Sequence, residues 1–288
     1  MSVEDPLGDR MKLYEGQEAG RRFMPQVPIM ARLDGRAFHT FCRGLEKPYD
    51  KGFHDLMVET LRFLVDETNA IVGYTQSDEI SLCWFSDDPK SQVFFDGRIQ
   101  KMTSVLAALA TAQFNRLLPK DLPAKAHLLP VFDARVWLVP NQGEAANTFL
   151  WRENDASRNS ILSAGQAQFS HKEMQGLGTN EVQEKLFQEK GINWNDYPDW
   201  AKRGTWLRRV RVTRTFTTDE LDKLPAKHAA RTNPNLQVER SEIQRVAMPK
   251  FGSVMNRVET LFRGDTPLVN LPTPPVGEPG YMEPPLDC

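Results

Sequence analysis

Residues 70–85, with the sequence AIVGYTQSDEISLCWF, contain two short runs of strand-forming residues on either side of a polar tetrapeptide. The runs are 71–75 and 80–85, and the residues between them are Gln76, Ser77, Asp78 and Glu79. Apolar and β-branched runs joined by a polar turn are typical of a β-hairpin. We therefore expect a hairpin here, and its place in the chain decides how the flanking segments are arranged.

Predicted elements on both sides of the hairpin complete an α+β pattern. Before it, an apolar run at 28–34 predicts a strand, and residues 51–67 place apolar side chains at helical spacing. After it, residues 91–116 predict a second helix, and residues 131–140 predict a fourth strand. The order β-α-β-β-α-β is that of the split βαβ, ferredoxin-like arrangement, an antiparallel sheet with its helices on one face. In this arrangement the first strand lies beside the returning arm of the hairpin.

Acidic residues stand at two points that this topology would bring together. Asp34 ends the first strand, and Asp78 and Glu79 lie in the hairpin turn. Oxygen ligands with no Cys or His nearby suit Mg²⁺, and a divalent ion relieves the repulsion between two close carboxylates. Gly35 would let a main-chain carbonyl approach an ion or a phosphate closely. Either segment alone is also explained as an ordinary polar turn, whereas the two together favour a metal site.

Basic residues that follow Asp34 could surround the phosphates of a nucleoside triphosphate. Arg36, His39 and Lys47 are the first of them, and Arg98 and Lys101 share one face of the second predicted helix. Such a set, with two metal ions, suffices for phosphoryl or nucleotidyl transfer. The alternatives are a solvated pair for Arg98 and Lys101, and a packed or surface residue for His39. The chain contains neither a GxxxxGK[ST] phosphate loop nor a GxSxG nucleophile motif.

The net charge of −2 gives no overall field for nucleic acid, but the charge is unevenly distributed. Residues 201–250 contain 12 Lys or Arg and 5 Asp or Glu, a difference of +7. Within them the run WLRRVRVTR predicts a basic strand that carries Arg208, Arg209 and Arg211 close to Trp206. This strand could bind an RNA backbone, and an exposed sheet edge protected by charge is an equal alternative.

Three cysteines without CxxC spacing favour a reducing compartment and argue against a disulfide framework or a zinc ribbon. The segment MSVEDPLGDRMKLYEG is acidic and polar, unlike a signal peptide. No apolar run approaches the roughly 18–20 residues needed to span a bilayer. We therefore expect a cytoplasmic protein. The Pro-rich residues 265–288 are expected to form an irregular tail.

Six short motifs follow one another between residues 28 and 206: RLDGRAFHTF, LEKPYD, GYTQSDEISL, FDARVWLVP, FLWRENDASRNSI and GINWNDYPDWAKRGT. Together they resemble the tRNA-His guanylyltransferase superfamily, whose members add nucleotides in the 3′-to-5′ direction. The resemblance implies a polymerase-type palm and two Mg²⁺ ions held by Asp34, Asp78 and the Gly35 carbonyl. It implies that Asp34, Asp78 and Glu79 are catalytic. The nucleotide-binding residues that it implies are Gly35, Arg36, Ala37, Phe38, His39, Lys47, Asp50, Ser77, Arg98, Lys101 and Asn159.

The resemblance also implies a reaction in two steps. ATP or GTP activates a tRNA 5′-monophosphate as a nucleotidyl adduct, and the 3′-hydroxyl of an incoming nucleoside triphosphate then attacks the activated end. Ser157 stands where eukaryotic members that add a guanosine to tRNA-His carry the His of a His-Ile-Asn-Asn run, and Asn159 keeps the first Asn. The SRNS form is similar to the bacterial, archaeal and phage branch, which is associated with repair of 5′-truncated tRNAs.

We therefore expect an Mg²⁺-dependent nucleotidyltransferase that repairs tRNA 5′ ends. Residues 1–140 would form the palm-like catalytic domain, 141–264 a helical and β extension for RNA binding and oligomerisation, and 265–288 the tail. Arg158, with Asp155, would help to seat the RNA. The resemblance implies a homotetramer that binds tRNA. The alternatives are a dedicated tRNA-His guanylyltransferase, another palm enzyme such as a nucleotide cyclase, and a non-catalytic RNA-binding scaffold.

Overall fold

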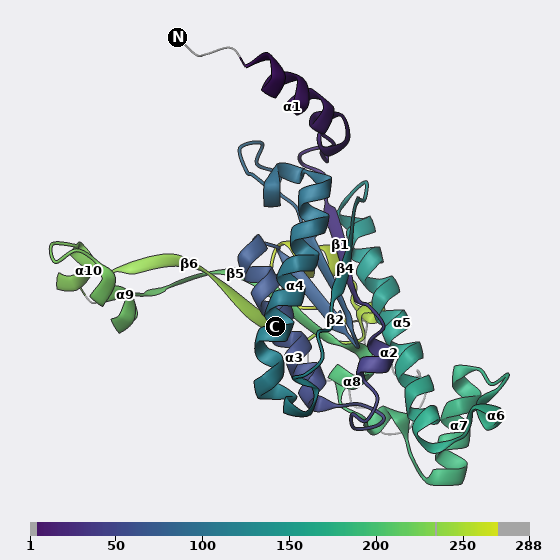
Figure 1. Ribbon diagram of the computed structural model, residues 1–288. Helices are drawn as coiled ribbons and strands as arrows, with labels where there is room; N and C mark the ends of the chain where they lie inside the picture. Colours follow the sequence, from purple (N-terminus) through teal and green to yellow (C-terminus); the bar gives the residue numbers. More distant parts are fainter. Residues whose placement is uncertain (1–4, 234, 270–288) are drawn as a thin grey trace.

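A six-stranded antiparallel sheet forms the centre of the molecule, with the strand order β4-β1-β3-β2-β5-β6 (Figure 1). The computed structural model describes residues 5–233 and 235–269. The strands are β1 (Ile29–Gly35), β2 (Val72–Gln76), β3 (Glu79–Trp84), β4 (Phe132–Leu138), β5 (Thr205–Thr215) and β6 (Gln237–Val246).

The predicted hairpin is confirmed as β2 and β3. All residues of both strands are buried, which explains why the two runs contain mostly apolar and small side chains. Ser77 turns the chain in the left-handed region, with φ of 48°. β1 pairs with β3 and β4, with Leu33 opposite Ile80. The expected placement of the first strand beside the returning arm is therefore confirmed.

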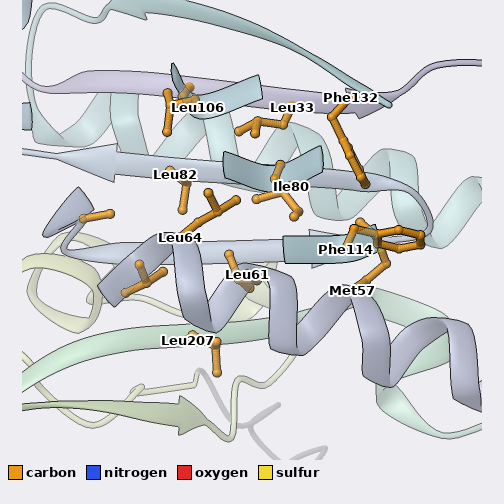
Figure 2. Packing of buried hydrophobic residues seen from close by; sticks show 14 of the residues in the cluster. Leu33, Met57, Leu61, Leu64, Ile80, Leu82, Leu106, Phe114, Phe132 and Leu207 are labelled. Carbon is orange, nitrogen blue, oxygen red and sulfur yellow. The ribbon is translucent and has the colours of Figure 1, made fainter. Parts of the chain in front are cut away.

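Two long helices cover one face of the sheet, as expected for a palm. They are α3 (Lys51–Thr68) and α4 (Ile99–Asp121). Figure 2 shows Leu61 and Leu64 of α3 facing Ile80 and Leu82 on the sheet, and all four side chains are fully buried. Gly73 lets α3 approach closely, because a Cβ at that position would lie 2.5 Å from Leu61 Cδ1. The helical spacing of apolar residues in 51–67 is explained by this packing of α3 against the sheet.

A third long helix, α5 (Gln142–Gln168), covers the opposite face of the sheet. Its buried Phe149 packs 5.3 Å from the ring of Trp206 on β5, and Trp206 in turn contacts Tyr74 on β2. The palm helices thus share one face, and α5 of the extension covers part of the other. The sheet itself continues past residue 140, because β5 pairs with β2.

Beyond the body, β5 and β6 continue as a two-stranded ribbon with two short helices at its tip (Figure 1). The shorter helices of the chain are α1 (Pro6–Ala19), α2 (Phe38–Phe41), α6 (His171–Met174), α7 (Thr179–Lys190), α8 (Asp199–Arg203), α9 (Thr218–Lys223), α10 (Ala229–Thr232) and α11 (Arg257–Phe262). The 3₁₀ turns are η1 (Phe94–Gly97), η2 (Pro123–Lys125), η3 (Trp194–Asp196) and η4 (Phe251–Ser253).

Several predicted boundaries are wrong for local reasons. The second palm helix begins at Ile99 and not at residue 91, because Phe95 and Asp96 have positive φ values of 49° and 53°. The first helix of the expected extension begins at Gln142, where the Asn141 side chain caps it. The strand β6 was not predicted. Most of the expected tail lies outside the described residues. No helix in the described ranges is long and apolar enough to cross a membrane.

Candidate active site

The two expected metal carboxylates meet at one edge of the sheet. Asp34 stands near the end of β1, and Asp78 lies in the turn between β2 and β3. The main-chain N–H of Gly35 donates to the carbonyl oxygen of Asp78 at 3.1 Å, which holds the two segments together. Burial, and to a smaller extent the charge of Asp34, raises the pKa of Asp78. The described part of the chain offers neither carboxylate an ion-pair partner.

This pair fits a hard divalent ion. No group of three or more His, Cys, Asp or Glu side chains suitable for a metal occurs within residues 5–233 and 235–269. Mg²⁺, however, is commonly held by one or two carboxylates, while substrate phosphates and waters provide its remaining ligands. Two neighbouring carboxylates without a cationic partner match that donor set. Asp34 and Asp78 could therefore hold Mg²⁺ together with a phosphorylated substrate.

A cleft of about 520 Å³ opens beside the carboxylates. The loop 42–50, the hairpin turn, α5 and α8 line it, with Asp34, Lys47, Asp78, Asn159 and Trp200 among its walls. Its size suits a nucleotide, because pockets for small ligands and cofactors typically enclose about 300–1,000 Å³. Lys47 is exposed and pairs with none of the described residues, so its ammonium group is available to an anion.

The segment that follows Asp34 divides between the core and the surface. Phe38 is 2 % exposed and packs against Phe114 at 5.5 Å, so only its main chain can contact a nucleotide. Its ring explains Gly35, since a Cβ on Gly35 would lie 2.3 Å from the ring. Arg36 and His39 remain exposed at this edge. Phe38 was expected to bind the nucleotide, but its side chain belongs to the core.

Two other expected nucleotide-binding residues have local structural partners at the cleft. Asp50 caps α3 by accepting a hydrogen bond from the N–H of Phe53 at 2.8 Å, and it also accepts from the N–H of Glu46 at 3.0 Å. The Ser77 hydroxyl donates to Asp78 Oδ1 at 3.0 Å. Both residues line the cleft, so these bonds fix the loop and the turn that face a bound ligand.

Glu79 is held by a buried arginine and is not a free acid. Arg152 of α5 donates from Nε to Glu79 Oε1 at 2.6 Å and from Nη2 to Oε2 at 2.7 Å. Arg152 also donates to Asp155 at 2.9 Å, and Arg158 and Asn159 reach the same Asp155 carboxylate. This network joins α5 to the sheet beside Asp34 and places Asn159 on the cleft wall. Glu79 thereby positions α5, and its expected catalytic role stays a prediction.

Arg98 and Lys101 lie at the other end of the palm. Arg98 precedes α4 and forms a β-bridge with Arg22, upstream of β1. Leu122, at the far end of α4, approaches Gly52 in the first turn of α3, which directly follows the loop that lines the cleft. A helix of this length spans about 35 Å. Within one chain, therefore, neither residue is part of the cleft.

The basic strand contributes mostly structural arginines. Arg208 donates to the carbonyl oxygen of Thr260 at 2.6 Å, and burial lowers its pKa. Arg209 donates to the carbonyl oxygen of Val65 at 2.6 Å and thereby caps the end of α3. The Arg211 side chain is 85 % exposed and makes an ion pair with a glutamate of β6 at 3.3 Å. Of the three, only Arg211 is free enough to meet a polyanion.

An aromatic cluster at the cleft was missed. The Tyr49 ring packs edge-on against Tyr197 at 5.0 Å and against Trp200 at 6.4 Å, and its hydroxyl donates to the carbonyl oxygen of Ser160 at 2.8 Å. His54 stacks on Trp200 at 4.5 Å, and burial lowers the His54 pKa to about 4, so this ring is neutral near pH 7. Tyr197 and Trp200 both lie in the segment GINWNDYPDW, whose density of aromatic residues could have indicated this cluster.

Comparisons with known proteins agree on one family. A model of the family described as tRNAHis guanylyltransferase matches residues 8–140. A tRNA(His) guanylyltransferase of Schizosaccharomyces pombe is 32% identical over 212 residues, which are 69% of this chain and 78% of that protein. The structure of a bacterial tRNA(His) guanylyltransferase-like protein in complex with ATP is 42% identical, with a TM-score of 0.67 over 70% of this chain and 88% of that one. The structure of a bacterial tRNA(His) guanylyltransferase-like protein in complex with GTP is 32% identical, with a TM-score of 0.64 over 86% of this chain and 94% of that one.

We predict that Arg152→Met destabilises the fold strongly. The substitution removes both hydrogen bonds to the buried Glu79 carboxylate and leaves only the looser contact with Arg32 at 3.8 Å, so we expect the free energy of unfolding to fall by about 3–5 kcal/mol in urea titrations. The double variant Glu79→Gln/Arg152→Met should recover part of the loss. Arg158→Gln is the matched control, because this arginine is 62% exposed and its removal should change stability by less than about 1 kcal/mol. Equal losses in the two single variants would contradict the assignment.

We predict a pH-dependent effect at Glu153, whose side chain is 2 % exposed beneath the network. Burial raises its pKa from 4.5 to about 7. The folded state therefore binds a proton that the unfolded state releases, and this group's contribution to the free energy of unfolding falls as pH rises from 4.5 to 7. Relative to the native chain, Glu153→Gln should gain up to about 3 kcal/mol across that window in urea titrations. Glu144→Gln, an exposed carboxylate on the same helix, is the control, and parallel pH profiles for all three proteins would refute the prediction.

Proposed function

The chain belongs to the tRNA(His) guanylyltransferase family and is a nucleotidyltransferase, and from this premise we propose that it adds nucleotides to the 5′ end of tRNA with the help of Mg²⁺. One observation carries the proposal. Asp34 and Asp78, from segments 44 positions apart, meet without a cationic partner among the described residues at the mouth of a nucleotide-sized cleft. The names of the related structures, which are complexes with ATP and GTP, support nucleoside triphosphates as substrates.

The proposed reaction consists of two substitutions at phosphorus. In the first, an oxygen of the RNA 5′-phosphate attacks the α-phosphorus of ATP, and pyrophosphate leaves as the nucleotidyl adduct forms. In the second, the 3′-hydroxyl of the incoming nucleoside triphosphate attacks the activated RNA phosphorus, and AMP leaves. Bound Mg²⁺ would neutralise the charge that develops on the phosphate oxygens.

The residues of this chain bind and orient the reactants. Lys47 lines the cleft together with both carboxylates, and the exposed Arg36 follows Asp34 by two residues, so both cations would stabilise the charge of a bound triphosphate. The main-chain N–H of Gly35 holds the hairpin turn, so Asp34 and Asp78 stay at a fixed separation during both steps. The neutral His54 and Trp200 provide an apolar wall on which a nucleobase can pack.

We further propose that the physiological reaction is repair of 5′-truncated tRNAs in the cytoplasm by a homotetramer. The DASRNS segment, with Ser157 in place of the eukaryotic His, supports repair over dedicated addition of a guanosine to tRNA-His. The similarity to bacterial guanylyltransferase-like proteins supports it as well. Dedicated guanosine addition is the alternative that the experiment below separates.

The deciding experiment supplies the protein with ATP, nucleoside triphosphates, Mg²⁺ and tRNAs labelled at the 3′ end. One set lacks the first nucleotide of several tRNAs, and the other is full-length tRNA-His. We expect growth at the 5′ end of the truncated set, with the added base complementary to the opposite strand. Growth confined to full-length tRNA-His would support dedicated guanosine addition, and no growth in either set would refute the proposed activity.

We predict that Asp34→Asn and Asp78→Asn each reduce the rate of nucleotide addition at least about 1,000-fold, because each removes a charge that the ion and the triphosphate require. Thermal unfolding should remain close to that of the native chain, since neither carboxylate has an ion-pair partner in the described residues. Asp9→Asn, on the remote helix α1, is the matched control and should keep full activity. Addition at the native rate by either active-site variant would exclude the carboxylate pair from catalysis.

A further inference from the structure

Two rows of like charge cross the sheet on the face that α5 covers in part. Asp34 on β1 stands directly opposite Asp133 on β4 and Glu79 on β3, which makes a row of acids. Two residues earlier on β1, Arg32 stands directly opposite Arg135. Like charges directly opposite each other on neighbouring strands destabilise a sheet. In the acidic row Arg152 pairs with Glu79, and a bound cation would relieve the repulsion around Asp34. The basic row, about 7 Å away, would be stabilised by an anion.

The arginine row is only loosely neutralised within the chain. The Nε of Arg32 lies 3.8 Å from Glu79 Oε2, and an Nη of Arg135 lies 3.5 Å from Asp133 Oδ1. Neither arginine donates a hydrogen bond to a side chain or carbonyl in residues 5–233 and 235–269. The side chains of Arg135 and Asp133 are each 54% exposed. An incoming anion can therefore reach the guanidinium group of Arg135, and the Arg32 side chain, which is 19% exposed, lies directly opposite it.

A large aromatic ring stands beside this row. Trp151 of α5 is 54% exposed, although most aromatic side chains of the chain are buried or half-buried. The guanidinium carbon of Arg32 lies 5.7 Å from its ring centroid, and that of Arg152 lies 4.4 Å away. Exposed aromatic rings next to arginines are the usual platform for single-stranded nucleic acid, since the base stacks and the phosphate is neutralised.

We propose that Arg135, Arg32 and Trp151 bind the 5′-terminal nucleotide of the RNA, with its phosphate at the exposed guanidinium group of Arg135 beside Arg32 and its base on the indole ring. The proposal rests on the proposed function. None of the three lines the cleft, whereas Asp34 belongs both to the cleft and to the row beside Arg32. The triphosphate in the cleft and the RNA end on this face would thus meet at Asp34.

A contact between copies of the chain would also use exposed Trp and Arg side chains. The position of the patch favours RNA. Arg32 and Arg135 stand two residues along their strands from Asp34 and Asp133. A phosphate bound by these arginines would lie next to the carboxylates, and a contact between copies of the chain does not require that position. The test therefore follows RNA binding, the 5′-phosphate and the oligomeric state separately.

The experiment measures the Kd, by fluorescence anisotropy without nucleoside triphosphates, of a tRNA that lacks its first nucleotide and carries either a 5′-monophosphate or a 5′-hydroxyl. Trp151→Ala should weaken binding of both RNAs about tenfold, whereas Trp151→Phe should retain most of the affinity. Arg135→Gln should weaken binding of the phosphorylated RNA about tenfold and of the 5′-hydroxyl RNA much less, so the preference for the phosphate is lost. The Kd of ATP should be unchanged in all three variants.

Two remote variants provide the controls. Phe187→Ala removes an aromatic residue that is 57% exposed on α7, and Arg10→Gln removes a cation from α1, and both should bind either RNA as the native chain does. Native affinity in Trp151→Ala and Arg135→Gln would overturn the proposal, as would a changed molar mass in light scattering with unchanged RNA affinity, which would mark an interface between copies. Nucleotide addition by the native chain in that case would show that the proposed function stands without this subsite.

Discussion

The site depends on the pairing of β1 with the returning arm of the hairpin. This pairing places the end of β1 at the hairpin turn, where the Gly35 N–H donates to the Asp78 carbonyl oxygen. A register shift of one residue would turn Asp34 into the α3 and α4 core and Leu33 out of it. The fully buried side chains of Leu33, Ile80 and Leu82 therefore fix the position of the carboxylates.

One face of the sheet is covered by apolar packing, and the other carries the charged residues of the site. On one side, α3 and α4 pack apolar side chains against it (Figure 2). On the other side, α5 covers only part of the surface, and the Glu79–Arg152 pair joins the helix to the strands beside Asp34. Because a buried ion pair tolerates the loss of neither partner, this contact fixes where α5 lies. The position of α5 in turn sets one wall of the cleft and presents Trp151 at the exposed edge.

Several basic side chains lie in the fold where their sequence motifs did not predict them. Arg208 and Arg209 look like a polyanion site in WLRRVRVTR, yet main-chain carbonyl oxygens at the ends of other elements take their donors. Arg98 and Lys101 have the right chemistry for a triphosphate but stand at the opposite end of α4. No sequence pattern predicted that Arg32 and Arg135 are neighbours, because they lie in different motifs and meet only where β1 pairs with β4.

Local patterns were enough to predict the order of the palm elements, the hairpin, the two acids beside its turn and the family, because hydrophobic periodicity and short ordered motifs are local properties of the chain. The burial of Phe38 in the core, the pairing of Glu79 with Arg152, the extension of the sheet by β5 and β6 and the position of two facing arginines beside Trp151 became visible in the folded chain alone. Those facts depend on the distances between segments far apart in the chain, and such distances are set by packing and by strand register, which no local pattern encodes.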